Sequence, residues 1–180
     1  NGKKYKWNDQ PFLDLYTTEA KADGSFGVIE ELNGPLSSKL HESSAVFTKD
    51  GNVMYFTRNV EDNREMRREN IETVRLQILK STKDENGKWG KTESVHFNGL
   101  DYSVAHPAIN PAGTKMYFVS DMSGTIGKSD IFEVAINKDG TLGTPVALGT
   151  LVNTEGVESF PYMNAEGDLF FSSNGFNGFG

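Results

Sequence analysis

Short apolar runs alternate with polar turns along the whole chain, and three stretches repeat the same order. In each stretch a short strand pattern is followed by a turn with glycine and by a second strand rich in aromatic residues. Self-similarity of this kind is typical of repeat architectures. The three stretches span residues 44–57, 106–120 and 160–173.

A second pattern follows the first two stretches and also precedes the first one. It consists of a strand, a polar turn, a glycine, an apolar residue and a second glycine. Asp-Gly and Asn-Gly between alternating runs favour a tight hairpin, because both residues tolerate the positive φ of that turn. We therefore expect four short antiparallel strands in each unit. The strands of this second pattern are predicted at residues 12–17, 73–80 and 129–136, with turns at 21–27, 84–90 and 137–143.

One such four-stranded sheet cannot bury both of its faces, so the units are expected to pack side by side. The predicted fold class is all-β, a β-propeller of four-stranded antiparallel blades, of which about three are present. Because propellers usually have four to eight blades, the pattern predicts a fragment of a longer chain. The expected division is the end of a blade at 1–40, blades at 41–102 and 103–157, and the start of a blade at 158–180.

Composition removes several classes of function. The chain has no cysteine, which excludes disulfides, thiol catalysis and cysteine-ligated metals. Its formal net charge of -7 argues against nucleic acid as a partner, which requires a basic face. No apolar run approaches the roughly 18 residues of a membrane helix. We expect no cofactor.

Histidines and carboxylates are the candidates for catalysis and for metal binding. His41 and His106 precede the first strands of their units, and without a third ligand we interpret them as contacts to a neighbouring blade. Asp121 and Asp130 form an incomplete calcium pattern, and Asp130 is expected to accept N–H groups of the preceding glycine turn. No metal site and no catalytic residue are therefore predicted.

Three glutamates, Glu42, Glu155 and Glu158, stand near the expected blade junctions. A glycosidase needs two carboxylates that face one cleft, and the sequence spacing does not establish such a pair. Turn and junction roles are favoured. No Gly-x-Ser-x-Gly element is present, and propeller peptidases carry catalysis on a separate hydrolase domain.

Two loops are candidates for binding a partner, because recognition residues concentrate on loops of rigid scaffolds. The first is an insertion in which arginines alternate with acidic residues. It is interpreted either as a loop that binds a partner or as a solvated loop with compensating charges. The second is a Gly/Asn-rich loop with two phenylalanines. The candidate residues are Arg58, Arg64, Arg67, Arg68, Arg75, Phe176 and Phe179.

Residues 105–121 resemble the TolB-type, WD40-like propeller repeat, and Ser129-Asp130-Ile131-Phe132 is similar to the opening of its third strand. Residues 145–149, 152–155 and 158–161 resemble the blade junction of OmpA-family, PorE-like envelope proteins. That resemblance implies a role in type IX secretion or gliding, with a PorP/SprF-type outer-membrane β-barrel or an adhesin component as partner. It also implies peptidoglycan binding only through a domain outside these residues.

The leading hypothesis is therefore a non-catalytic, protein-binding scaffold in the periplasm, associated with the outer membrane. Two alternatives stay open. One is a propeller-fold hydrolase or lyase that acts on glycans, and the other is a ligand-binding sensor domain.

Overall fold

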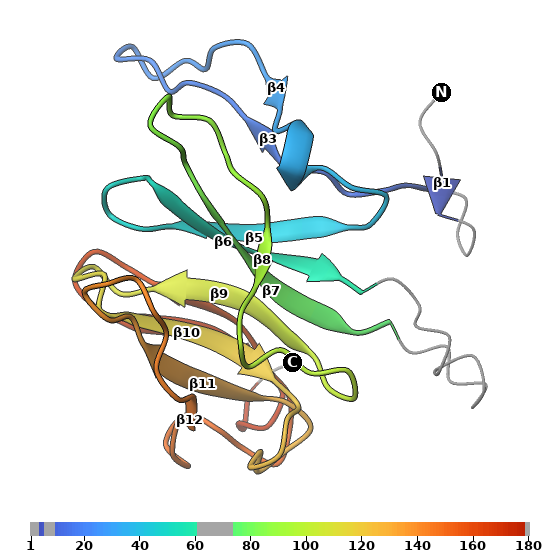
Figure 1. The fold of residues 1–180 in the computed structure, drawn as a ribbon. Coiled ribbons are helices and arrows are strands. Elements are labelled where there is room, and N and C mark those ends of the chain that lie inside the picture. Colours follow the sequence, from blue (N-terminus) through green and yellow to red (C-terminus); the bar gives the residue numbers. More distant parts are fainter. Residues whose placement is uncertain (1–3, 6–9, 61–73, 179–180) are drawn as a thin grey trace.

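The computed structural model describes residues 4–5, 10–60 and 74–178, and it is built almost entirely of β-strands (Figure 1). One short 3-10 helix, η1 (Gly34–Leu36), interrupts them. The strands are β1 (Lys4–Tyr5), β2 (Gln10–Pro11), β3 (Tyr16–Thr17), β4 (Glu30–Glu31), β5 (Glu42–Phe47), β6 (Val53–Asn59), β7 (Leu76–Thr82), β8 (Glu93–Ser94), β9 (Val104–Ile109), β10 (Lys115–Ser120), β11 (Asp130–Ala135), β12 (Val146–Ala147), β13 (Glu158–Met163) and β14 (Leu169–Ser173).

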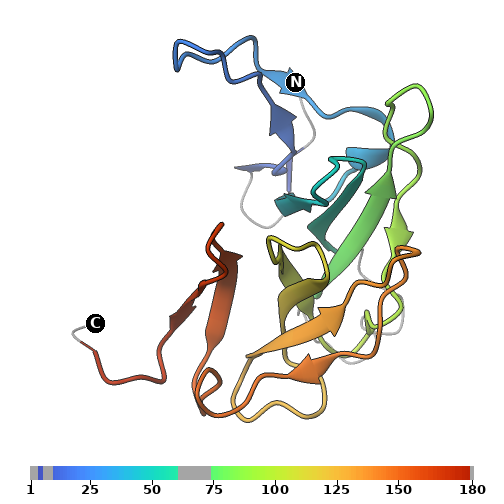
Figure 2. The same cartoon turned by 90° about the vertical axis from the view of Figure 1, so that its left-hand side faces the viewer.

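Two complete sheets form the centre of the molecule. Each has four antiparallel strands in sequence order, β5-β6-β7-β8 and β9-β10-β11-β12. Two-stranded sheets flank them, β3-β4 on one side and β13-β14 on the other, and β1 pairs with β2. Figure 2 shows these sheets side by side along an arc. The all-β class and the antiparallel sheets are confirmed, and a closed propeller is not seen among the described residues.

The hairpins form where glycine supplies a positive φ. Gly87 and Gly140 close the turns after β7 and β11 with φ of 75° and 78°, and Gly24 does the same in the N-terminal unit with φ of 83°. Each turn is closed by an N–H···O bond across four residues, such as Gly87 N to Asp84 O at 2.9 Å. The turn pattern in the sequence therefore predicted these hairpins correctly.

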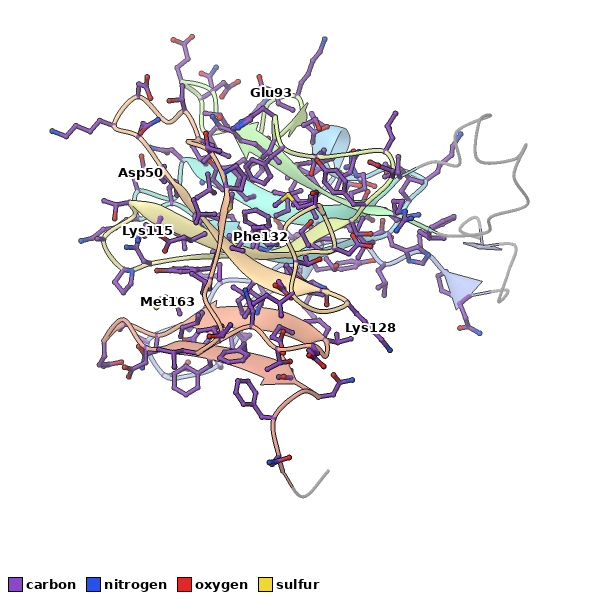
Figure 3. The ribbon with its side chains drawn as sticks, turned by 90° about the horizontal axis from the view of Figure 1, so that it is seen from below. Asp50, Glu93, Lys115, Lys128, Phe132 and Met163 are labelled. Atoms are coloured by element: carbon purple, nitrogen blue, oxygen red, sulfur yellow. The ribbon has the colours of Figure 1, made fainter. Side chains whose placement is uncertain are left out.

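Apolar side chains fill the spaces between consecutive sheets. The larger cluster lies between the two four-stranded sheets and includes Tyr55 and Ile78 from one sheet and Met116, Phe118 and Phe132 from the other. In Figure 3, Phe132 lies among these packed side chains, whereas Lys115 and Lys128 point outward at opposite ends.

A smaller cluster of Leu36, Met54 and Phe56 packs against the N-terminal sheet. Alternate residues of β6 thus face opposite neighbours, as the period of a strand requires.

The strand bounds differ from the prediction in two places. β7 begins at Leu76 and extends to Thr82, whereas residues 73–80 were expected. The strand expected at 12–17 is reduced to β3 at Tyr16–Thr17, which pairs with β4 through two residues. Both four-stranded sheets lie inside the ranges 41–102 and 103–157, and the division of the chain into these blades stays a prediction. No helix among the described residues is long and apolar enough to cross a membrane.

Candidate functional site

Polar side chains gather at the end of the sheets where each first strand begins and each second strand ends. The register places Glu42 opposite Arg58, and Glu158 opposite Ser173 in the C-terminal sheet. The middle sheet has Val104 at the same position. We call this end of the sheets the polar end.

Glu42 and Arg58 form a buried ion pair at the polar end. Arg58 Nε donates to Glu42 Oε1 at 2.7 Å, and Arg58 Nη2 donates to the Leu36 carbonyl at 2.9 Å. The Ser38 hydroxyl donates to the same carboxylate at 2.5 Å, while Oε2 has no hydrogen-bond partner among the described residues. Burial raises the pKa of Glu42, and the bonds from Ser38 and Arg58 offset only part of that rise. Glu42 is therefore buried and held at the junction by Ser38 and Arg58.

Glu158 has hydroxyl and backbone partners in place of an arginine. It accepts bonds from Thr154 N at 2.9 Å, Thr154 Oγ1 at 2.7 Å and Ser173 Oγ at 2.6 Å. Burial alone raises the pKa of this carboxyl, but the three bonds outweigh it and leave the pKa below its ordinary value. Glu155 is exposed on the same connection. The junction roles expected for Glu42 and Glu158 agree with these contacts.

A side-chain oxygen at or just after the end of each second strand accepts a bond from the backbone just before the first strand of the same sheet. Asn59 Oδ1 accepts from His41 N at 2.5 Å, and Asp121 Oδ1 accepts from Ser103 N at 2.6 Å. In the C-terminal sheet Asn174 Oδ1 accepts from Val157 N at 2.8 Å. We call Asn59, Asp121 and Asn174 the clamp residues.

The calcium candidates are both used in the fold. Asp121 is a clamp residue that also pairs with Arg75 at 3.2 Å. Asp130 accepts from Ile126 N at 2.8 Å and Gly127 N at 3.2 Å, as the turn predicted. The part of the chain that the structure describes holds no cluster of ligands suited to a metal ion.

Each first strand carries a β-bulge with a non-glycine residue in the left-handed region. These residues are Ser44, His106 and Phe160, with φ of 51°, 55° and 51°, and the register shifts beside each of them. Such a conformation costs about 1–3 kcal/mol in a residue other than glycine. Its recurrence at one repeat position shows that the bulge belongs to the architecture, where it redirects one side chain per strand.

These bulges were missed from the sequence, although a signal was present. Pro107 and Pro161 follow the left-handed residues directly, and proline inside a strand is confined to edges and bulges.

His106 and Phe160 meet across neighbouring first strands. Strand β9 contacts β5 on one side and β13 on the other, and the two rings stack with centroids 4.2 Å apart and planes 21° apart. His106 N donates to Thr57 Oγ1 at 2.9 Å, which joins it to the preceding sheet. Burial lowers the pKa of His106, which favours the neutral imidazole.

His41 precedes β5, as the sequence predicted, whereas His106 lies inside β9 at the bulge and not before that strand. His41 Nδ1 accepts from Leu13 N of the neighbouring N-terminal unit at 3.2 Å. Both histidines contact a neighbouring sheet, as expected.

The candidate partner-binding residues are only partly described. Arg58 and Arg75 lie at the polar end, where Arg58 is only 12% exposed and Arg75 pairs with Asp121. Phe176 is half exposed, with its ring centroid 6.2 Å from that of Phe171. The rest of the set lies outside the described residues, namely Arg64, Arg67, Arg68 and Phe179. Their role in binding stays a prediction.

Comparison with known proteins gives a likeness of fold. No protein-family model matches the chain, and no curated protein matches it. Among solved structures it is similar to puromycin hydrolase, with a TM-score of 0.56 and 14% identity. A serine-to-alanine mutant of puromycin hydrolase complexed with PGG gives a TM-score of 0.58 and 15% identity. Each likeness covers 89% of this chain and 24% of the other, so the chain spans about a quarter of the proteins it resembles.

A puromycin-hydrolyzing peptidase of Mycobacterium tuberculosis is also similar, at 18% identity and a TM-score of 0.44, over 75% of this chain and 20% of that chain.

Two expectations are corrected by this finding. The recognition of an OmpA-family, PorE-like envelope protein with WD40-like repeats is wrong, because the structures that share the fold are puromycin hydrolases. The expectation of a protein without enzymatic activity is corrected for the same reason. The β-rich fold itself is shared with those enzymes. The predicted outer-membrane partner and periplasmic location stay predictions.

Proposed function

We propose that this chain forms the propeller-type part of a hydrolase that cleaves amide bonds in peptide-like substrates, puromycin among them. The observation that supports the proposal is the fold likeness to puromycin hydrolase over 89% of the chain. It favours the hydrolase alternative over the scaffold, and it favours an amide substrate over a glycan.

The catalytic group of this hydrolase is expected to come from outside these 180 residues. The chain contains no Gly-x-Ser-x-Gly element. The buried carboxylates that are described, Glu42, Asp130 and Glu158, hold their own sheets and turns. The role proposed for this part of the protein is therefore to bind and orient the substrate beside a nucleophile carried elsewhere.

The test is hydrolysis by the protein purified at its native length from its own cells. Puromycin and phenylalanine p-nitroanilide serve as substrates, and a fluorophosphonate probe labels an active serine. We expect cleavage of the amide bond in both and a labelled serine outside residues 1–180. Boiled protein is the control. Absence of both cleavage and labelling in folded protein contradicts the proposal.

A further inference from the structure

Asparagine followed by glycine is a pair at which a protein chain can modify itself, because asparagine is chemically labile. The glycine nitrogen attacks the side-chain carbonyl carbon of the asparagine, and glycine has no Cβ to hinder the approach. An intramolecular attack of this kind requires both groups to reach the reacting geometry. The hydrogen bonds of each pair therefore decide how readily it reacts. The pairs with described surroundings are Asn33–Gly34, Asn86–Gly87, Asn98–Gly99 and Asn174–Gly175, whereas Asn177–Gly178 borders residues outside the described part.

Two of these asparagines are fixed through their side chains. Asn98 Oδ1 accepts from Ile78 N at 3.0 Å, and Asn98 Nδ2 donates to the Ile78 carbonyl at 2.7 Å. Asn174 is a clamp residue whose Oδ1 accepts from Val157 N at 2.8 Å. These bonds must break before either side-chain carbonyl can turn toward the glycine that follows it, so the fold protects both asparagines.

In the Asn86–Gly87 pair the turn holds the glycine nitrogen. Gly87 N donates to the Asp84 carbonyl at 2.9 Å, and this bond closes the hairpin after β7. The turn has to open before that nitrogen can attack. Asn86 is therefore protected by the backbone, although its side chain is exposed.

The Asn33–Gly34 pair has neither restraint. Asn33 Nδ2 donates one long bond to the Glu31 carbonyl at 3.3 Å, and neither Asn33 Oδ1 nor Gly34 N has a hydrogen-bond partner among the described residues. The backbone at Asn33 is extended, with ψ of 179°. No described atom beyond its chain neighbours lies within 4 Å of the place that a Cβ would take on Gly34. Rotations within Asn33 can thus bring the two reacting groups together without breaking a backbone bond.

The connection that carries this pair is itself held at both ends. Leu32 N donates to the Leu15 carbonyl at 2.8 Å before the pair, and Leu36 is 1% exposed after it. The free Gly34 N–H therefore belongs to an ordered connection between β4 and η1.

We propose that Asn33 is a site of spontaneous deamidation in the folded protein and that it reacts ahead of Asn86, Asn98 and Asn174. The Gly34 nitrogen bonds to Cγ of Asn33, the C–N bond of the side-chain amide breaks, and the proton of the Gly34 N–H leaves with that nitrogen as ammonia. Water then opens the cyclic imide at either carbonyl, which leaves aspartate or isoaspartate at position 33. The reaction needs only this chain and water, so it is independent of the proposed hydrolase activity.

Either product changes the connection beside the polar end. A carboxylate replaces the amide that donates to the Glu31 carbonyl, and isoaspartate also adds its side-chain carbon to the main chain. The segment that follows carries Leu36, whose carbonyl accepts from Arg58 at 2.9 Å. The modification therefore alters the segment that contacts the buried ion pair.

Peptide mass spectrometry tests the site on the purified native-length protein, kept folded in mildly alkaline buffer. Tryptic peptides 22–39 and 92–115 report on Asn33 and Asn98. We expect peptide 22–39 to deamidate about tenfold faster or more, because Asn98 must first break its bonds to Ile78. Equal rates in the folded protein overturn the proposal.

The same measurement in urea separates the fold from the sequence. Both asparagines precede glycine, so the two rates should agree within about twofold once the chain is unfolded and the bonds of Asn98 are lost. A tenfold difference that persists in urea would place the cause in the local sequence and overturn the structural argument.

Variants locate the reaction by a second measurement, the early release of ammonia from the folded protein. Asn33→Gln keeps an exposed amide, but its longer side chain would have to close a larger ring. We expect it to lower the initial rate of release. Asn86→Gln is the matched control at an equally exposed pair and should leave the rate unchanged. Equal reductions in the two variants overturn the assignment to Asn33.

Discussion

Glu42 and Glu158 occupy the same repeat position but have different partners. Arg58 faces Glu42, whereas hydroxyl and backbone groups surround Glu158. Removing one member of a buried ion pair leaves an uncompensated charge, whereas replacing a carboxylate among hydroxyls leaves dipoles that can reorient. The two sites are therefore expected to respond differently to substitution and to pH.

Arg58→Ala is expected to destabilise the protein by about 3–5 kcal/mol, because Glu42 is then buried without its ion-pair partner. Urea unfolding followed by circular dichroism measures the change. The control is Lys115→Ala, which removes a more exposed pair with Glu133 and should change stability little. Equal effects of the two substitutions would show that burial of the Glu42–Arg58 pair does not increase its contribution to the free energy of unfolding.

Glu158 is expected to contribute to acid sensitivity. Its pKa is lowered in the folded protein, so its contribution to stability is present above the unfolded value of about 4.5 and is lost as pH falls through the folded value. Glu158→Gln should therefore flatten the loss of stability below about pH 4.5 relative to the wild type, as measured by urea midpoints from pH 6 to pH 3. An unchanged slope would contradict the assignment.

At the scale of the element, an asparagine connects the third strand of each four-stranded sheet to the segment that follows its fourth. Asn153 Oδ1 accepts from Ile131 N at 2.9 Å, and its Nδ2 donates to the Ile131 carbonyl at 3.0 Å. Asn98 makes the same pair of bonds to Ile78 at 3.0 and 2.7 Å. The fourth strands have only two residues each, so these asparagines extend the pairing.

Asn153→Ala is expected to cost about 1–3 kcal/mol, the usual penalty when a buried N–H such as that of Ile131 loses its partner. Thermal unfolding by calorimetry measures the loss. Asn137→Ala serves as the control, because Asn137 lies in an exposed turn and bonds only Thr141 through its side chain. A smaller loss for Asn153 than for Asn137 would refute the proposed role.

The sequence predicted the features that depend on neighbouring residues in the chain better than those that depend on contacts between sheets. The glycine turns and the alternation of apolar and polar residues predicted the hairpins at Gly87 and Gly140, because turn formation depends on local sequence. The bulges at His106 and Phe160 were missed, although the prolines that directly follow them are a local signal for a bulge. The insertion near Arg64 was predicted as a loop and lies outside the described residues.

The mistaken family recognition has a physical cause. The motif residues that suggested the envelope family include Asn153, which bonds the backbone of Ile131, and Glu158, which accepts bonds from Thr154 and Ser173. In this chain these groups hold strands and their connections, so they indicate the fold and not the activity. The ring stack of His106 and Phe160 could not be predicted from the sequence, because this 4.2 Å contact joins two sheets.

At the scale of the whole molecule, each sheet turns the same face toward the sheet that follows it in the chain. Tyr55 on β6 faces the next sheet and is 1% exposed, and Phe170 has the equivalent position on β14 and is 54% exposed. Tyr162 beside it is also exposed. The face of β13–β14 that carries these rings has no covering sheet among the described residues.

Matched substitutions at this repeat position are expected to differ strongly. Tyr55→Ala should destabilise the 180-residue chain by about 3–5 kcal/mol, because it opens a cavity in the core. Phe170→Ala should cost less than about 1 kcal/mol, as a surface change does. Urea unfolding of both variants makes the comparison. A large loss for Phe170→Ala would mean that the face is covered in solution.

The clamp residues also bear on how such a chain can diverge. Each clamp needs one side-chain oxygen in reach of a backbone N–H, and Asn59, Asp121 and Asn174 meet that need with two different residue types. Val104 likewise stands where the neighbouring repeats have glutamate. These repeat positions therefore accept more than one residue type. Few positions then require one particular residue type, so a shared fold at 14–15% identity is what such a chain allows.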